Sequence, residues 1–259
     1  MSRIPLTFEC QGVKCVGTLD TAPGLTGLLI VNGGNEIRSG AFQGQSRLAA
    51  RIAKAGFPVF RFDRRGTGDS DGENRGFRKS RKDILAAIEA FQATTPQMTR
   101  IVAFGNCDAA SALMLASGAG CDRLILANPW TFEDGAVEQT PDAVRTRYLA
   151  KLAKRGEWKR LLTGGVNLRK LAKGLVAAAK PAAPPSALTD EMRAGLAEFG
   201  GSYKFLIAGR DRTGLAFEKS WRGDEQRIAR CEGATHGFVE AEAAQWLEKK
   251  LLGTLRKTD

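Results

Sequence analysis

The sequence predicts an α/β protein with a twisted, mostly parallel sheet, helices on both faces and a helical lid that interrupts the core. Short apolar runs alternate with amphipathic segments of roughly 10 to 15 residues, which is the pattern of βαβ units with right-handed crossovers. The run at residues 27–31 is apolar throughout, as expected of a strand buried on both faces. The alternation stops at about residue 131 and resumes at about residue 201. We therefore expect a core of residues 1–130 and 201–259 and a cap of residues 131–200.

The N-terminal part of the chain predicts a hairpin followed by the first strand–helix–strand unit. Two runs of alternating polarity flank Gln11 and Gly12, which favour a tight turn. Behind the apolar run, Leu48 and Ile52 recur at helical spacing, and Gly56 ends that segment. The expected strands are residues 6–10, 13–19, 27–31 and 58–62, and the expected helix is 45–55.

The same alternation continues to residue 127 and returns after the insertion. Ile84, Ile88 and Phe91 give the second expected helix an apolar face, and Trp246 and Leu247 do the same for the last one. The expected strands are residues 100–104, 123–127, 203–208 and 226–230, and the expected helices are 80–92, 108–116 and a final one that begins at 239.

The composition is that of a globular chain and excludes several other classes. With 259 residues, of which 43% are apolar, the chain can bury a sizeable core. No apolar run approaches the roughly 20 residues of a membrane-spanning helix, and the first residues lack a secretory signal, so we expect a cytoplasmic protein without a membrane span. A basic cluster indicates the solvated start of a helix and no nucleic-acid partner. It consists of Arg75, Arg78, Lys79, Arg81 and Lys82.

Cysteine and histidine usage limits the chemistry further. His236 is the one histidine, which argues against a metal site or an acid–base pair that needs two imidazoles. The cysteines are irregularly spaced and form no CxxC pair, which indicates reduced thiols and neither a disulfide framework nor a zinc site. No cofactor and no metal are expected. The cysteines are Cys10, Cys15, Cys107, Cys121 and Cys231.

The strongest candidate for a nucleophile is Cys107, in the segment Phe-Gly-Asn-Cys-Asp-Ala at residues 104–109. This segment lies between an expected buried strand and an expected helix. Gly105 and Ala109 are small, as a tight turn that projects a nucleophile above a sheet requires. The N–H groups at the start of the helix would favour an anionic sulfur. Cysteine is also common in protein cores, so the motif alone leaves a structural role open.

Two later residues complete a possible triad. Asp211 follows the end of a late expected strand, and His236 lies in a loop after the last one. Nucleophile, acid and base in this chain order, each at the carboxyl end of a strand, is the order of the α/β-hydrolase triad. The imidazole would take the thiol proton, and the carboxylate would hold the ring in its productive tautomer. Taken singly, His236 also fits a surface loop and Asp211 also fits a turn.

Over nearly its full length the chain resembles the α/β-hydrolase superfamily. Asn32-Gly33-Gly34 stands where the His-Gly oxyanion loop of that superfamily lies. Residues 61–70, Arg-Phe-Asp-Arg-Arg-Gly-Thr-Gly-Asp-Ser, are similar to its D-x-R-G-x-G-x-S loop. The resemblance implies the α/β-hydrolase fold with a lid. The sequence departs from the usual pattern with Cys107 in place of Ser, Ala109 in place of Gly and Asn32 in place of His.

A narrower resemblance concerns residues 105–110, Gly-Asn-Cys-Asp-Ala-Ala, and residues 128–130, Asn-Pro-Trp. Together with the basic lid, they resemble the exosortase A system-associated hydrolases. Members of that family are encoded with exopolysaccharide and protein-sorting systems of Gram-negative bacteria, and their substrates are poorly defined. The resemblance implies a role linked to exopolysaccharide.

An acyl reaction at Cys107 needs hydrogen-bond donors for the developing oxyanion. The expected donors are the backbone N–H groups of Asp108 and of Gly34 or its neighbour Asn35. The charge of Asp108 suits a helix N-terminus, yet it would oppose a neighbouring thiolate. The sequence does not determine whether this side chain points into the site.

The expected lid carries most of the chain's excess positive charge. The whole chain has 39 basic and 28 acidic residues, a balance of +11, and residues 141–180 alone hold eleven against two, a balance of +9. A cationic rim would attract anionic substrates such as phosphopantetheine thioesters of acyl carriers or acidic polysaccharide. The alternative is a charged face that only serves solubility. The residues expected to contact substrate are Asn106, Arg145, Arg147, Lys151 and Arg155.

Three functions agree with these features. The first is a Cys-dependent hydrolase of an ester, thioester or lactone. The second is an acyltransferase with a carbohydrate or protein acceptor. The third is a non-catalytic protein that binds an acidic partner or the surface of a membrane through its basic lid.

Overall fold

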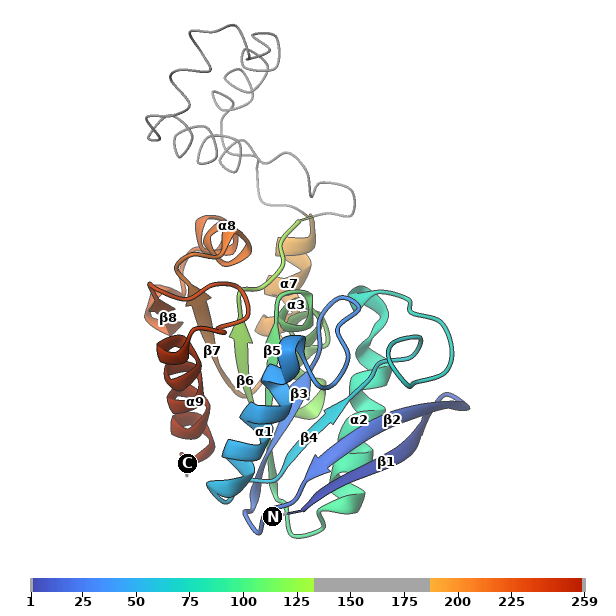
Figure 1. Ribbon diagram of the computed structural model, residues 1–259. Helices are drawn as coiled ribbons and strands as arrows, with labels where there is room; N and C mark the ends of the chain where they lie inside the picture. Colours follow the sequence, from blue (N-terminus) through green and yellow to red (C-terminus); the bar gives the residue numbers. More distant parts are fainter. Residues whose placement is uncertain (1, 133–186, 258–259) are drawn as a thin grey trace, which may run out of the picture. The chain divides into compact units, whose positions relative to one another are not determined.

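The computed structural model describes residues 2–132 and 187–257 of the chain. Within them, eight strands form one sheet in the order β1-β2-β4-β3-β5-β6-β7-β8 (Figure 1). β1 and β2 form an antiparallel hairpin, β2 pairs antiparallel with β4, and all later pairs are parallel. The strands are β1 Arg3–Cys10, β2 Val13–Asp20, β3 Thr26–Val31, β4 Val59–Phe62, β5 Arg100–Asn106, β6 Arg123–Ala127, β7 Ser202–Ala208 and β8 Ile228–Cys231.

Helices cover both faces of this sheet. Val59 of β4 belongs to the hydrophobic cluster that includes residues of α1 and α9, whereas the ring of its neighbour Phe60 stacks on Phe91 of α2 at 5.5 Å. Because successive side chains of a strand point to opposite faces, α1 and α9 cover one face and α2 covers the other. The helices are α1 Gly44–Lys54, α2 Arg81–Thr94, α3 Asp108–Leu115, α7 Ala187–Ala197, α8 Arg212–Ser220 and α9 Ala241–Leu255.

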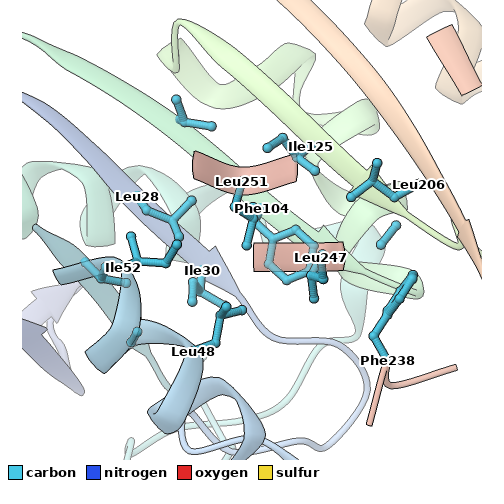
Figure 2. Packing of buried hydrophobic residues seen from close by; sticks show 14 of the residues in the cluster. Leu28, Ile30, Leu48, Ile52, Phe104, Ile125, Leu206, Phe238, Leu247 and Leu251 are labelled. Carbon is cyan, nitrogen blue, oxygen red and sulfur yellow. The ribbon is translucent and has the colours of Figure 1, made fainter. Parts of the chain in front are cut away.

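The core beneath α1 and α9 draws on every central parallel strand. Figure 2 shows side chains from β3, β5, β6 and β7 meeting those of the two helices and of the loop that precedes α9. Phe238 is part of this cluster, and it lies two residues after His236. The cluster therefore fixes the loop that carries the histidine as well as the sheet. Its labelled members are Leu28, Ile30, Leu48, Ile52, Phe104, Ile125, Leu206, Phe238, Leu247 and Leu251.

The α/β architecture predicted from the alternation is confirmed, with local differences late in the chain. Helix α8, which begins directly after Asp211, is not predicted by the sequence pattern, because its nine residues are few and Gly214 interrupts them. The strand expected at 226–230 begins only at Ile228, after a helical turn at Glu225–Arg227. The last helix begins at Ala241 rather than at residue 239.

The chain divides into two compact units. The first comprises Met1–Thr131 and Thr189–Asp259, and the second comprises Phe132–Leu188. Nearly all of α7 belongs to the unit of the sheet. Arg78 pairs with Glu191 of this helix at 2.6 Å, and a side chain at Gly195 would collide with the backbone of Met114. The absence of a side chain at Gly195 therefore allows α7 to pack closely against α3.

Among the helices in the described ranges, none is long and apolar enough to cross a membrane.

Candidate active site

Cys107 lies at a strained turn between β5 and α3. Its backbone has φ 62° and ψ −129°, a conformation that a side chain other than that of glycine rarely adopts. Its N–H donates to the carbonyl of Ala127 at 2.9 Å, which ties the turn to the end of β6. A Cβ atom added at Gly105 would lie 2.7 Å from the backbone carbon of Ala109, so this position requires glycine. The turn therefore has the geometry of a nucleophile elbow.

Asp211 and His236 form a hydrogen-bonded pair. The distance from His236 Nδ1 to Asp211 Oδ2 is 2.9 Å. Asp211 also caps α8, because the same oxygen accepts the N–H of Gly214 at 3.0 Å. Asp211 is 8% exposed, so its carboxylate is hydrogen-bonded mainly by protein groups and little by water. The pair has the contact that orients an imidazole in a triad.

Charge and hydrogen bonding favour the protonated form of His236. Its hydrogen bond with Asp211, followed by its hydrogen bond with Cys107, raises the pKa of His236 to about 10, against an opposing effect of burial. Burial acts to raise the pKa of Asp211, but the hydrogen bond and the charge of His236 outweigh it and lower that pKa. The hydrogen bond between Cys107 and His236 brings the three predicted residues into one site.

Two asparagines hold the backbone of His236. The side-chain amide of Asn106 donates to the carbonyl of His236 at 3.0 Å, and that of Asn128 donates to the same oxygen at 3.2 Å. Asn128 also donates to Asn106 Oδ1 at 3.0 Å and accepts the N–H of Ala208 at 2.8 Å. Asn128 is fully buried with φ 42°. The two residues thus join the ends of β5, β6 and β7 to the histidine loop.

The Gly34 N–H, one of the expected oxyanion donors, bonds to the carboxylate of Asp108. The N–H of Gly34 donates to Asp108 Oδ1 at 2.7 Å and to Oδ2 at 2.8 Å. Asn35, the alternative donor, is exposed, and its side-chain oxygen accepts a bond from Asn74 at 2.8 Å. A Cβ atom at Gly33 would collide with Asp108, so glycine permits this close approach. The Asp108 side chain therefore points toward the oxyanion loop.

Arg64 also contacts this loop and is 4% exposed. Its Nη2 donates to the carbonyl of Gly34, and its charge interacts with that of Asp108. Burial raises the pKa of the Asp108 carboxyl, although the charge of Arg64 and the N–H of Gly34 act to lower it. A carboxylate, a guanidinium and an oxyanion loop thus meet at Gly34.

The predicted substrate contacts fall into two groups. Arg145, Arg147, Lys151 and Arg155, expected to contact substrate, lie outside the described residues. Asn106, also expected to contact substrate, lies at the site, with its amide on His236.

Sequence reasoning missed Asn128 and Arg64 as residues that position the site. Both stand in segments that carried the resemblance, the Asn-Pro-Trp segment and the loop at residues 61–70. The available signal was their place near the ends of buried strands, since Asn128 directly follows β6 and Arg64 lies two residues after β4.

The raised pKa of His236 predicts a pH-dependent stability. Because the folded pKa of about 10 exceeds the ordinary value of 6.5, protonation of His236 stabilises the fold fully below pH 6.5 and progressively less up to pH 10. The loss cannot exceed about 1.4 kcal/mol per pH unit for one proton, and solvent screening reduces it because the side chain is 43% exposed. Urea unfolding at pH 6, 8 and 10 should show a steeper decline for the wild type than for His236→Gln. Equal declines would contradict the assignment of the shift to this residue.

The strand order and the turn after β5 are those of an α/β hydrolase. The chain belongs to the Alpha/beta hydrolase family, whose model matches residues 28–249. The resemblance to that superfamily and the predicted fold class are thereby confirmed. The narrower resemblance to exosortase-associated hydrolases stays a prediction. A comparison with curated proteins found no match.

Solved structures share this fold at low sequence identity. The α/β hydrolase GrgF from Penicillium sp. sh18 has a TM-score of 0.64 and 16% identity, covering 99% of this chain and 98% of its own. The esterase Pf2001 from Pyrococcus furiosus has a TM-score of 0.63 and 16% identity, covering 98% and 90%. The thioesterase domain from the curacin biosynthetic pathway has a TM-score of 0.59 and 14% identity, covering 98% and 100%. At this identity the similarity concerns the fold alone.

Proposed function

We propose that this protein hydrolyses an ester, thioester or lactone by covalent catalysis at Cys107. The observation that carries the proposal is the strained turn that presents Cys107 beside a histidine already paired with a carboxylate. A backbone strain of this kind costs roughly 1–3 kcal/mol and is typical of catalytic positions. A cysteine that served only to fill the core would need neither the strain nor the histidine.

In the acylation step, Cys107 Sγ attacks the carbonyl carbon while the π electrons move to the carbonyl oxygen. His236 holds the thiol proton in its imidazolium form and transfers it to the leaving oxygen or sulfur as the tetrahedral intermediate collapses. Asp211 keeps Nδ1 of the ring occupied, so the reacting nitrogen is Nε2. The products of this step are an alcohol or thiol and an acyl-cysteine.

In the deacylation step, water takes the place of the leaving group. His236, now neutral, accepts a proton from the water as its oxygen attacks the acyl carbon. The second tetrahedral intermediate expels Cys107 Sγ and releases the carboxylic acid, and the proton returns the site to its starting state. Thiolate leaves more readily than an amine, so esters and thioesters suit this site better than peptides.

Two observations support the proposed substrate class: the activities of proteins with the same fold and the excess of basic residues in this chain. An esterase and a thioesterase domain are among the proteins with this fold. The excess of basic residues at 141–180 favours an anionic acyl thioester, such as one on phosphopantetheine. The Gly-Asn-Cys-Asp-Ala-Ala resemblance favours a role linked to exopolysaccharide.

A panel of p-nitrophenyl esters and acyl-CoA thioesters tests the proposal. We expect turnover of both, with kcat/KM for the anionic thioester falling as salt is raised from 50 to 500 mM and kcat for a neutral ester nearly unchanged. Reversal of the charges at Arg145, Arg147, Lys151 and Arg155 should remove that salt dependence. If kcat/KM for the thioester does not change with salt, the basic residues serve solubility and do not attract the substrate.

Thiol alkylation gives a second, substrate-free test. Iodoacetamide at neutral pH should modify Cys107 fast and abolish turnover with the same time course. Cys231 is a matched control, because it is also a half-buried free thiol and burial raises its pKa. Faster labelling of Cys231 than of Cys107 would contradict an activated nucleophile at residue 107.

A further inference from the structure

The Asp108 carboxylate lies where the proposed reaction needs a free hydrogen-bond donor. The Gly34 N–H donates to both of its oxygens, at 2.7 and 2.8 Å. One N–H hydrogen cannot serve this carboxylate and the carbonyl oxygen of a substrate at full strength. The negative charge would also repel the developing oxyanion. The carboxylate must therefore leave the Gly34 N–H before Cys107 attacks.

Arg64 offers a place for the displaced carboxylate. Its Nη2 bonds to the carbonyl of Gly34, the same residue whose N–H holds Asp108. Its Nη1 is buried and has no hydrogen-bond partner anywhere in residues 2–132 and 187–257. A buried donor without a partner is costly, and a carboxylate is the acceptor that a guanidinium binds most strongly.

The other carboxylate whose charge acts on Arg64 is already occupied. Asp83 Oδ1 accepts the backbone N–H of Arg65 at 3.1 Å and its Nε at 2.8 Å, and Oδ2 accepts its Nη2 at 3.1 Å. These bonds hold Asp83 on Arg65, and it makes no hydrogen bond with Arg64 Nη1. Among the described residues, the charges of two acidic side chains act on Arg64, and Asp108 is the one that Arg65 does not hold.

We infer that Arg64 is a positioning residue that receives the Asp108 carboxylate when the acyl group enters, which frees the Gly34 N–H for the substrate oxygen. The inference rests on the proposed function. No covalent bond changes in this step, because one carboxylate exchanges one charge-assisted hydrogen bond for another. Arg64 can keep Nη2 on Gly34 while Nη1 binds Asp108, since the planar guanidinium presents several donors at once.

A double-mutant cycle between Arg64 and Asp108 tests the exchange. The kcat on a neutral p-nitrophenyl ester is measured for the wild type, Arg64→Met, Asp108→Ala and the double variant. In the wild-type background we expect Arg64→Met to lower kcat by about tenfold to a hundredfold, because the carboxylate then stays on Gly34. In the Asp108→Ala background the same change should cost less than about threefold, because no carboxylate needs to be received.

Arg61→Met is the matched control. It removes another buried guanidinium, which bonds to Asp20 and Ser46 and not to Gly34. Its effect should be the same with and without Asp108. Should Arg64→Met fail to fold in urea titrations, Arg64→Lys keeps the charge and should cost less, again only when Asp108 is present.

The outcomes separate the inference from the proposed function. An equal loss in both Asp108 backgrounds would overturn the inference, because Arg64 would then only support the loop, and would leave Cys107 catalysis standing. Turnover by all four proteins at the level of Cys107→Ala would overturn the proposed function and the inference with it. A loss confined to the background with Asp108 supports both.

Discussion

Cys107→Ala and His236→Ala should each lower kcat/KM on an activated ester by about 10³-fold or more while the protein stays folded. The first substitution removes the atom that bonds to the acyl carbon, and the second removes the group that moves the proton. Neither side chain is in the buried core, so the free energy of unfolding near pH 7 should change little for Cys107→Ala. Steady-state assays and urea unfolding on the same preparations measure the two quantities.

The double variant is expected to be no worse than either single one, because the two residues act as a unit. Cys231→Ala, a substitution at the other half-buried thiol, should retain wild-type activity. Asp211→Asn should cost less than the loss of either partner, because the ring keeps its place but loses a charged acceptor. Activity of Cys107→Ala within tenfold of the wild type would show that another residue is the nucleophile.

Asn128→Ala should both lower the free energy of unfolding by roughly 2–4 kcal/mol and lower kcat. The substitution leaves the buried N–H of Ala208 without its acceptor, at a cost of about 1–3 kcal/mol, and puts alanine at φ 42°, at a cost of about 1 kcal/mol. It also removes one of the two donors to the carbonyl of His236, so the histidine loop is less well fixed. Urea unfolding and kcat on a neutral ester are the measurements.

Asn128→Gly separates the two contributions to that loss. Glycine tolerates the positive φ, so this variant should be more stable than Asn128→Ala by about 1 kcal/mol yet show the same reduction of kcat. A wild-type kcat in both variants would mean that Asn106 alone holds the carbonyl of His236. Equal free energies of unfolding for Asn128→Ala and Asn128→Gly would show that the positive φ at residue 128 does not contribute to the loss of stability.

The sequence predicted the parts of the site that depend on the ends of strands. Cys107, Asp211 and His236 each follow a run whose polarity pattern marks a strand, and parallel strands bring their carboxyl ends to one edge. The hairpin and the parallel strands could be predicted for the same reason, since periodicity is a local property. The helix α8 was missed because its nine residues are too short to show it.

The direction of the Asp108 side chain could not be predicted in this way. Its partner Gly34 is 74 positions away, and the contact depends on how the loop after β3 packs against the start of α3. The bond from Asn128 to His236 spans 108 positions. Contacts of this kind leave no periodic trace in the chain, so only the packed structure reveals them.

Asn106 is hydrogen-bonded to the carbonyl of His236, which lies 130 positions further along the chain. This separation affects how the protein folds. Closing so long a loop costs conformational entropy, which local contacts formed early in folding do not offset. Structures rich in long-range contacts therefore fold slowly. A chain that has formed the hairpin and the first parallel strands would already present the Cys107 turn, with its thiol exposed and no histidine beside it. The site is therefore completed only when the final quarter of the chain docks, and a half-folded molecule would carry a thiol open to oxidation without any capacity for turnover.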